Sequence, residues 1–183
     1  FLTPDIESEC AYPEYLKEKI KLLGNTEIFF DVSVGLAGHK GLDVDMLINK
    51  TYEMTDMQLK LLKDLVIGEK WDFFISVMIG TDRLQHMLWN HFDETHKRFI
   101  KNSPYKNSLR DYYSYIDKEL GEILKLLSDD TVVIVASDHG MIKQEGKINI
   151  NSWLIKEGYL VLKDGIELSE AKRFSTDFID MKK

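Results

Sequence analysis

The sequence has a single cysteine, Cys10, so no disulfide bond can form within the chain. This argues against a small secreted domain stabilised by disulfides. No apolar run approaches the roughly 20 residues that a membrane-spanning helix needs, so we expect no membrane partner. The first residues, Phe-Leu-Thr-Pro, contain neither an initiator methionine nor a signal-peptide pattern. We therefore expect a piece of a larger, cytoplasmic protein.

The sequence also has fewer basic than acidic residues: 24 Lys and Arg against 31 Asp and Glu, which gives a net charge of −7. Nucleic acids and anionic membrane surfaces attract basic proteins, so this balance argues against both kinds of partner. The composition is 44% hydrophobic and 30% charged, which is typical of a soluble globular protein. A chain of 183 residues is long enough for one domain with its own core.

Apolar residues recur every three or four positions along several parts of the chain, which is the pattern of amphipathic helices. Pro13 suits the first turn of the earliest of them, and Gly68 and Gly158 suit the ends of two others. We expect helices over 12–20, 45–67, 82–101, 109–128 and 148–158.

Two apolar runs have the length and composition of buried parallel strands. They cover 71–79 and 131–136, and the second is rich in β-branched residues. The order strand, helix, helix, strand predicts a right-handed crossover between them. We therefore expect an α/β fold, with a parallel or mixed sheet flanked by helices, as a partial domain. Shorter extended segments are expected at 27–34 and 159–162.

The predicted elements suggest a division of the chain into two parts. Residues 1–69 precede the strand at 71–79 and are expected to form a helical, cap-like insertion over the sheet edge. Residues 70–183 are expected to form the partial α/β catalytic core. We expect both parts to belong to one structural unit.

A carboxylate and an imidazole follow the second predicted strand, as Asp138 and His139. The carboxyl ends of strands are where the ligand sites of open α/β sheets gather, and Gly140 permits the chain to bend there. Aspartate and histidine are good ligands for zinc and manganese. The alternative is an aspartate that caps a turn beside a surface histidine.

A second pair, Asp82 and His86, follows the first predicted strand, and its i, i+4 spacing places both side chains on one face of a helix. The alternative is a capping box, in which Asp82 caps the helix together with Gln85. His91 and His96, farther along this helix, either line a cleft or are structural. Two such pairs at one edge of a sheet favour a two-metal site for phosphoryl transfer over coincidence.

The stretches Gly80–His86 and Val133–Met141 resemble the alkaline phosphatase superfamily, in particular its type I phosphodiesterase/nucleotide pyrophosphatase family, and the resemblance extends over residues 1–162. It implies two divalent metal ions, usually zinc, with manganese as the other candidate. Asp82 and His86 would bind one metal, and Asp138 and His139 the other. The catalytic Thr or Ser nucleophile, one further Asp and one further His of the family pattern have no counterpart in this chain, which we therefore expect to be inactive alone.

The resemblance implies a hydrolase that acts on a small-molecule phosphate ester or nucleotide, as a metal-dependent phosphodiesterase or nucleotide pyrophosphatase. A phosphomutase or a sulfatase of the same superfamily is an alternative, since only the missing nucleophile separates them. A third alternative, of another class, is a non-catalytic binding or regulatory domain that has kept the fold.

Overall fold

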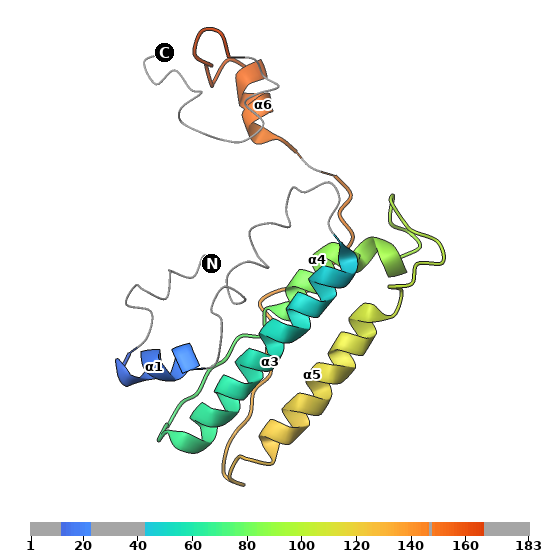
Figure 1. Ribbon diagram of the computed structural model, residues 1–183. Helices are drawn as coiled ribbons and strands as arrows, with labels where there is room; N and C mark the ends of the chain where they lie inside the picture. Colours follow the sequence, from blue (N-terminus) through green and yellow to red (C-terminus); the bar gives the residue numbers. More distant parts are fainter. Residues whose placement is uncertain (1–11, 23–42, 147, 167–183) are drawn as a thin grey trace. The chain divides into compact units, whose positions relative to one another are not determined.

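A computed structural model describes residues 12–22, 43–146 and 148–166. The chain divides into two compact units, 1–143 and 144–183. None of the described helices is both long and apolar enough to cross a membrane. The first unit contains the helices α1 (Tyr15–Leu22), α3 (Val44–Gly68), α4 (Gly80–Phe92) and α5 (Ser108–Leu124), and the second contains α6 (Ile150–Lys156) (Figure 1).

The core of the first unit lies where α3, α4 and α5 pack against one another (Figure 1). Leu84 and Leu88 of α4 are four residues apart and fully buried, and Tyr112 and Ile116 of α5 repeat this spacing. Residues four apart lie on the same face of a helix, so each pair forms a continuous apolar stripe. Leu47 of α3 completes the cluster. The spacing in the sequence therefore determines which face of each helix is buried.

Helix α3 begins at a side-chain cap and is followed by a residue that contacts α1. The carboxylate of Asp43 accepts hydrogen bonds from the backbone N–H groups of Asp45 (3.0 Å) and Met46 (3.4 Å), as an N-cap residue does. After the helix, Glu69 accepts hydrogen bonds from the Tyr15 hydroxyl (2.6 Å) and the Lys19 ammonium (3.3 Å). These two bonds join α1 to the end of α3.

The predicted sheet is absent from the part of the chain that the structure describes, so the α/β prediction is wrong there: the described elements are all helices. The runs 71–79 and 131–136 are not helical, as expected, but neither forms a strand. Phe73 and Ile134 are 81% and 82% exposed. A β-strand needs a neighbour to take up its backbone hydrogen bonds, and neither run has one among the described residues.

The predicted helices occur, with shifted ends. The helix expected over 82–101 ends at Phe92, because the Asp93 carboxylate binds the backbone N–H and hydroxyl of Thr95 and so favours a turn. Residues 159–160 are bent and 162 is an isolated bridge, so the strand expected at 159–162 does not form. The segment 27–34 lies outside the described residues. Helix α3, which precedes residue 69, packs against α4 and α5, which follow it. The division of the chain into 1–69 and 70–183 stays a prediction.

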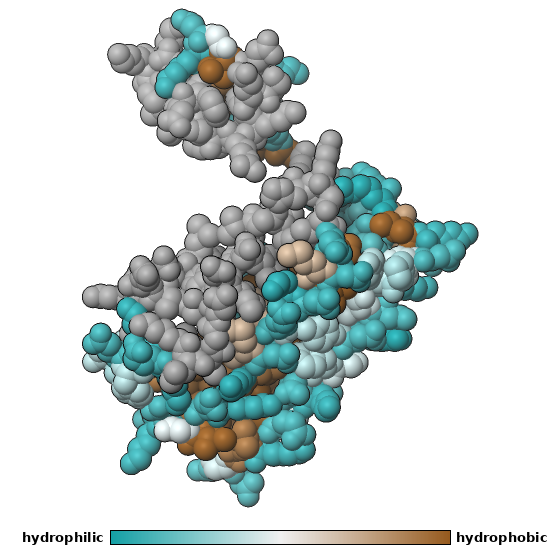
Figure 2. Space-filling model, in the orientation of Figure 1, coloured by the Kyte–Doolittle hydropathy of each residue, from teal (hydrophilic) through white to brown (hydrophobic). Residues whose placement is uncertain are grey.

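Figure 2 shows apolar surface among the hydrophilic residues that cover most of the visible face of the first unit. Part of the apolar composition is thus not used in the helical core. The exposed apolar residues include those of the two runs expected to be strands: Phe73, Ile75, Val77, Val132, Ile134 and Val135.

Candidate metal centre

Asp82 and His86 lie on one face of the first two turns of α4. The His86 Nε2 atom is 3.3 Å from Asp82 Oδ1, and the imidazole is 60% exposed. The capping alternative is wrong, because the N-cap of α4 is Ile79 and Asp82 lies inside the helix. Gln85 instead donates hydrogen bonds to the Thr81 carbonyl and the Tyr113 hydroxyl, both at 3.2 Å. The two candidate ligands are therefore free of a capping role.

Asp138 and His139 lie in an irregular segment that follows the run 131–136. The Ser137 hydroxyl donates a hydrogen bond to the His139 carbonyl (2.5 Å), which bends the backbone at this point. His139 Nδ1 lies 2.9 Å from the Gly140 carbonyl, an acceptor, so the ring proton is on Nδ1. Its Nε2 atom is 3.8 Å from Asp138 Oδ2. The bond to Gly140, followed by the carboxylate of Asp138, raises the pKa of His139.

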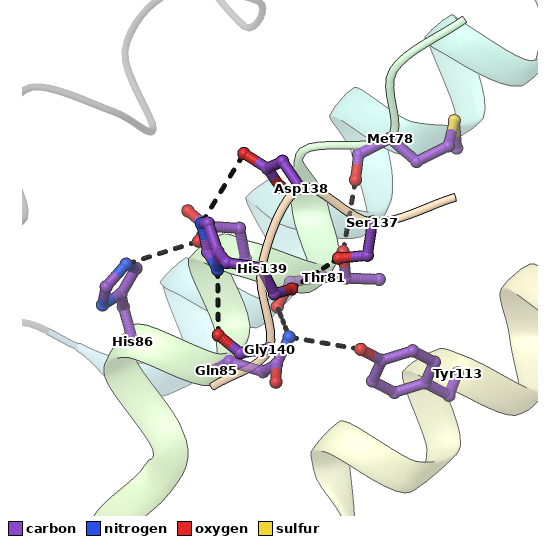
Figure 3. Close-up of polar contacts among 10 residues, drawn as sticks. Met78, Thr81, Gln85, His86, Tyr113, Ser137, Asp138, His139 and Gly140 are labelled. Atoms are coloured by element: carbon purple, nitrogen blue, oxygen red, sulfur yellow. Dashed lines mark hydrogen bonds and ion pairs between the residues drawn. The ribbon is translucent and has the colours of Figure 1, made fainter. Parts of the chain in front are cut away.

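The two motifs come near each other at the start of α4, where Figure 3 shows His86, Asp138 and His139 gathered. The Asp82 carboxylate also raises the pKa of His139, so its charge reaches across from the other motif. Metal-binding histidines characteristically donate one ring N–H to a carbonyl and ligate through the other nitrogen, which is the arrangement of His139. The donor set of two carboxylates and two imidazoles fits zinc or manganese.

The ligand set is nonetheless incomplete in the described part of the chain. Within residues 12–22, 43–146 and 148–166, no group of three or more His, Cys, Asp and Glu side chains is placed to hold one metal ion. Each motif supplies two donors, whereas a zinc site has three or four protein ligands. The geometry brings the donors together in pairs and brings the pairs near each other, without forming a closed coordination shell.

A contact beyond the motifs joins the irregular segment to the far end of α4. The Lys143 ammonium donates a hydrogen bond to the Thr95 carbonyl at 3.3 Å, and its charge acts on the Asp93 carboxylate. Hydrogen bonds from Thr95 and Trp89 are the main causes that lower the pKa of Asp93, so this carboxylate stays charged. The segment therefore lies near Asp82 at one end and is hydrogen-bonded to the loop just after α4 at the other.

His91 is a structural residue of α4 rather than a candidate ligand. It is buried, its Nδ1 atom lies 2.7 Å from the Ser103 hydroxyl, and its ring packs edge-on against Tyr105. Burial lowers the pKa of His91. A pocket of about 210 Å³ opens beside it, lined also by Glu94, Lys101 and other residues of the loop after α4, and none of the four candidate ligands lines it.

We expect the buried state of His91 to make folding sensitive to mild acid. Above a pH of about 6.5, the imidazole is neutral in both folded and unfolded chains, and it does not affect the pH dependence. As the pH falls below that value, the unfolded chain takes up the proton more readily, and the free energy of unfolding decreases. Urea unfolding at about pH 7.5 and about pH 5.5 measures this loss.

The His91→Gln variant isolates the effect, because glutamine does not titrate while the carboxylates are unchanged. The variant should lose less stability than the wild type between the two pH values, even though it starts from a lower stability. An equal loss in both proteins would show that His91 does not contribute to the acid sensitivity.

Sequence reasoning missed the residues behind the candidate ligands. Tyr112 and Thr55 are fully buried, and their hydroxyl oxygens lie 2.6 Å apart beside Gly80, the first residue of α4. A tyrosine on a helical apolar stripe has no sequence signature that distinguishes it from a core residue. The only signal was Gly80 itself, a glycine two residues before a candidate ligand.

The chain matches the family model described as type I phosphodiesterase / nucleotide pyrophosphatase over residues 8–178. No curated protein and no solved structure matches it. The matched range includes both motifs and all the described helices.

Proposed function

The chain belongs to the type I phosphodiesterase/nucleotide pyrophosphatase family, and from this premise we propose that it supplies four ligands of a two-metal site. Asp82 and His86 would hold one divalent metal ion, and Asp138 and His139 the other. The ions are zinc, with manganese as the alternative. The reaction is hydrolysis of a phosphodiester or pyrophosphate bond in a small molecule or nucleotide.

The main support is the approach of the two motifs at the start of α4. They are 52 to 57 positions apart in the sequence, yet the charge of Asp82 acts on His139. Two carboxylates and two imidazoles on exposed, adjoining segments form a donor set that suits metal ions and that has no role in the core. A non-catalytic domain would not need these side chains to lie together.

The residues of the two motifs would each have a defined part in the site. The metals, when bound, supply Lewis-acid stabilisation of charge on the phosphoryl oxygens. The Gly140 carbonyl holds the proton of His139 on Nδ1, and so keeps Nε2 available as a donor. The helical backbone holds Asp82 and His86 at one spacing, and Ser137 holds the bend that presents Asp138.

The site needs more ligands than the described residues provide, since they contain two donors per motif and no third ligand for either. We propose that the remaining ligands and the Thr or Ser nucleophile come from sequence outside this chain. A hydroxyl nucleophile outside this chain would lose its proton and attack phosphorus, the P–O bond to the leaving alcohol or phosphate would break, and water would then hydrolyse the resulting phosphoryl ester. This chain alone is expected to be inactive.

We expect hydrolysis by the complete protein to depend on bound metal. With bis(p-nitrophenyl) phosphate as substrate, dialysis against EDTA should abolish release of p-nitrophenol, and added Zn²⁺ or Mn²⁺ should restore it. The isolated 183-residue chain should show no release above the buffer rate under the same conditions. Hydrolysis that persists after EDTA, in a protein shown by elemental analysis to be free of metal, would disprove the proposal.

A further inference from the structure

Three helices meet at one buried point beneath the first turn of α4. Thr55 of α3 and Tyr112 of α5 are both fully buried, and their hydroxyl oxygens are 2.6 Å apart. The Thr55 hydroxyl also lies 2.7 Å from the Thr51 carbonyl, which can only accept, so the threonine proton points there. The Tyr112 hydroxyl therefore donates to Thr55 Oγ1. This bond fixes the far end of the tyrosine ring.

The fixed hydroxyl lies against the backbone of Gly80. A Cβ atom placed on Gly80 would be 1.9 Å from the Tyr112 hydroxyl oxygen and 2.8 Å from its Cζ atom. Real Cβ atoms do not approach so closely, so this position accepts glycine alone unless α4 or the ring moves. Tyr112 thus occupies a notch that exists because residue 80 has no side chain.

The notch lies at the part of α4 that needs support. The first backbone N–H groups of a helix have no partner within the helix, and side-chain caps usually satisfy them. Helix α4 has no side-chain cap bond at its N-cap, Ile79. Asp82 follows Gly80 by two residues, and His86 lies one turn farther on. The Thr81 hydroxyl donates to the Met78 carbonyl (3.2 Å), and packing of Tyr112 against Gly80 supports the turn from the side of the core.

We propose that Tyr112, held by Thr55, is a positioning residue that sets the first turn of α4 through Gly80, and so orients Asp82 and His86 toward a metal ion. The part about orientation toward metal rests on the proposed function. The part about the helix turn does not, because it depends only on contacts within the three helices. The two parts have separate measurements.

The first measurement is amide hydrogen exchange in the complete protein with Tyr112→Phe, which keeps the ring and removes the hydroxyl. Exchange at residues 83–86 is compared with exchange at 60–64 in α3, so that a general loss of stability cancels. We expect this ratio to rise about fivefold or more, which corresponds to about 1 kcal/mol of local stability. An unchanged ratio would overturn the positioning role.

Tyr115→Phe is the matched control. Tyr115 is also on α5, and its hydroxyl donates a hydrogen bond to Asp56 of α3. The variant loses a bond between the same two helices, without touching Gly80. We expect the exchange ratio to stay at the wild-type value. A rise equal to that of Tyr112→Phe would mean that any weakening between α3 and α5 loosens α4, and would overturn the specific role of Tyr112.

A second pair of variants tests the notch itself. Gly80→Ala should raise the exchange ratio more than Tyr112→Phe, because the new methyl group overlaps the hydroxyl oxygen. In the double variant, Gly80→Ala with Tyr112→Phe, the hydroxyl oxygen is gone. The ring atom nearest to the new methyl group is then Cζ, at 2.8 Å, so partial rescue is expected. A double variant as disturbed as Gly80→Ala would contradict the notch. If Gly80→Ala does not fold, recovery of folding in the double variant is the rescue.

The second measurement is the Zn²⁺ affinity of the complete protein by calorimetry. Tyr112→Phe should weaken binding by about tenfold or more, as the loss of supporting contacts around metal ligands commonly does, whereas Tyr115→Phe should not. Wild-type protein that binds neither Zn²⁺ nor Mn²⁺ would overturn the proposed function and the orienting role toward metal. Unchanged exchange in Tyr112→Phe, with normal Zn²⁺ binding in the wild type, would overturn the positioning inference alone.

Discussion

Asp138→Asn is expected to lower kcat/KM of the complete protein for bis(p-nitrophenyl) phosphate by more than about 100-fold, since the loss of outer supporting contacts alone can cost 10–100-fold. Asparagine has nearly the same shape but no charge, so the site loses a negative ligand beside a divalent metal ion. Asp82→Asn should have a loss of similar size. Initial rates over a range of substrate concentrations measure both effects.

The proposal that each motif binds its own metal ion adds a prediction about metal content. If each motif holds its own metal ion, each single variant should lose about one of two bound metals, as measured by elemental analysis of the purified protein. The double variant should be scarcely less active than either single variant, because residues that act as a unit are not additive.

Asp111→Asn is the control for the aspartate variants. Asp111 lies on α5, is largely exposed and pairs only loosely with Arg110 at 3.8 Å. Its kcat/KM and metal content should match the wild type. Wild-type activity in Asp138→Asn, or equal losses in Asp111→Asn and Asp138→Asn, would remove the basis for assigning Asp138 as a ligand.

Leu88→Ala should decrease the free energy of unfolding by about 2–5 kcal/mol. Leu88 is fully buried among α3, α4 and α5, and alanine would leave a cavity that the surrounding helices fill only in part. The total stability of a domain is about 5–15 kcal/mol, so this is a large share of it. Urea unfolding followed by circular dichroism at 222 nm measures the change, since helices dominate that signal.

Leu124→Ala is the matched control, because it is the same substitution on a neighbouring helix at a residue that is 50% exposed. Its effect should stay within about 0.5 kcal/mol, as for most surface substitutions. Similar losses in the two variants would mean that the three-helix interface is not the main source of stability. If Leu88→Ala is too unstable for a folded baseline, Leu88→Met, expected to cost less than about 1.5 kcal/mol, gives a measurable value.

The helices were predictable because their signal is local. The apolar spacing over 45–67 predicted α3 within one residue at each end, Val44–Gly68. On α5 the same spacing correctly placed Ile116 on the buried face, but it also placed there Tyr113, which is 46% exposed, and it missed Tyr112. The extra length predicted for α4 was wrong because the Asp93 side chain competes for backbone N–H groups after Phe92. That competition is visible only in the hydrogen bonds.

The strands were not predictable in the same way. The β-branched run 131–136 has the composition of a strand, but the structure assigns it no regular secondary structure. A sheet, however, is a set of hydrogen bonds between segments, and a segment's own residues do not specify which neighbour is present. In the described part of the chain, no neighbour pairs with it, and Val132 and Ile134 are exposed as a result.

The motifs Asp82–His86 and Asp138–His139 show the same difference between local and long-range information. The sequence by itself determined the pairing within each motif, because residues at i, i+4 on a helix and at i, i+1 in a bend are held close by the backbone alone. Only the tertiary structure decided that Asp82 lies near enough for its charge to act on His139, and that Tyr112 fills the space left by Gly80. Both pairs join segments far apart in the chain, which no local pattern encodes: packing of the helices brings Tyr112 to Gly80, and the path of the irregular segment brings His139 near Asp82.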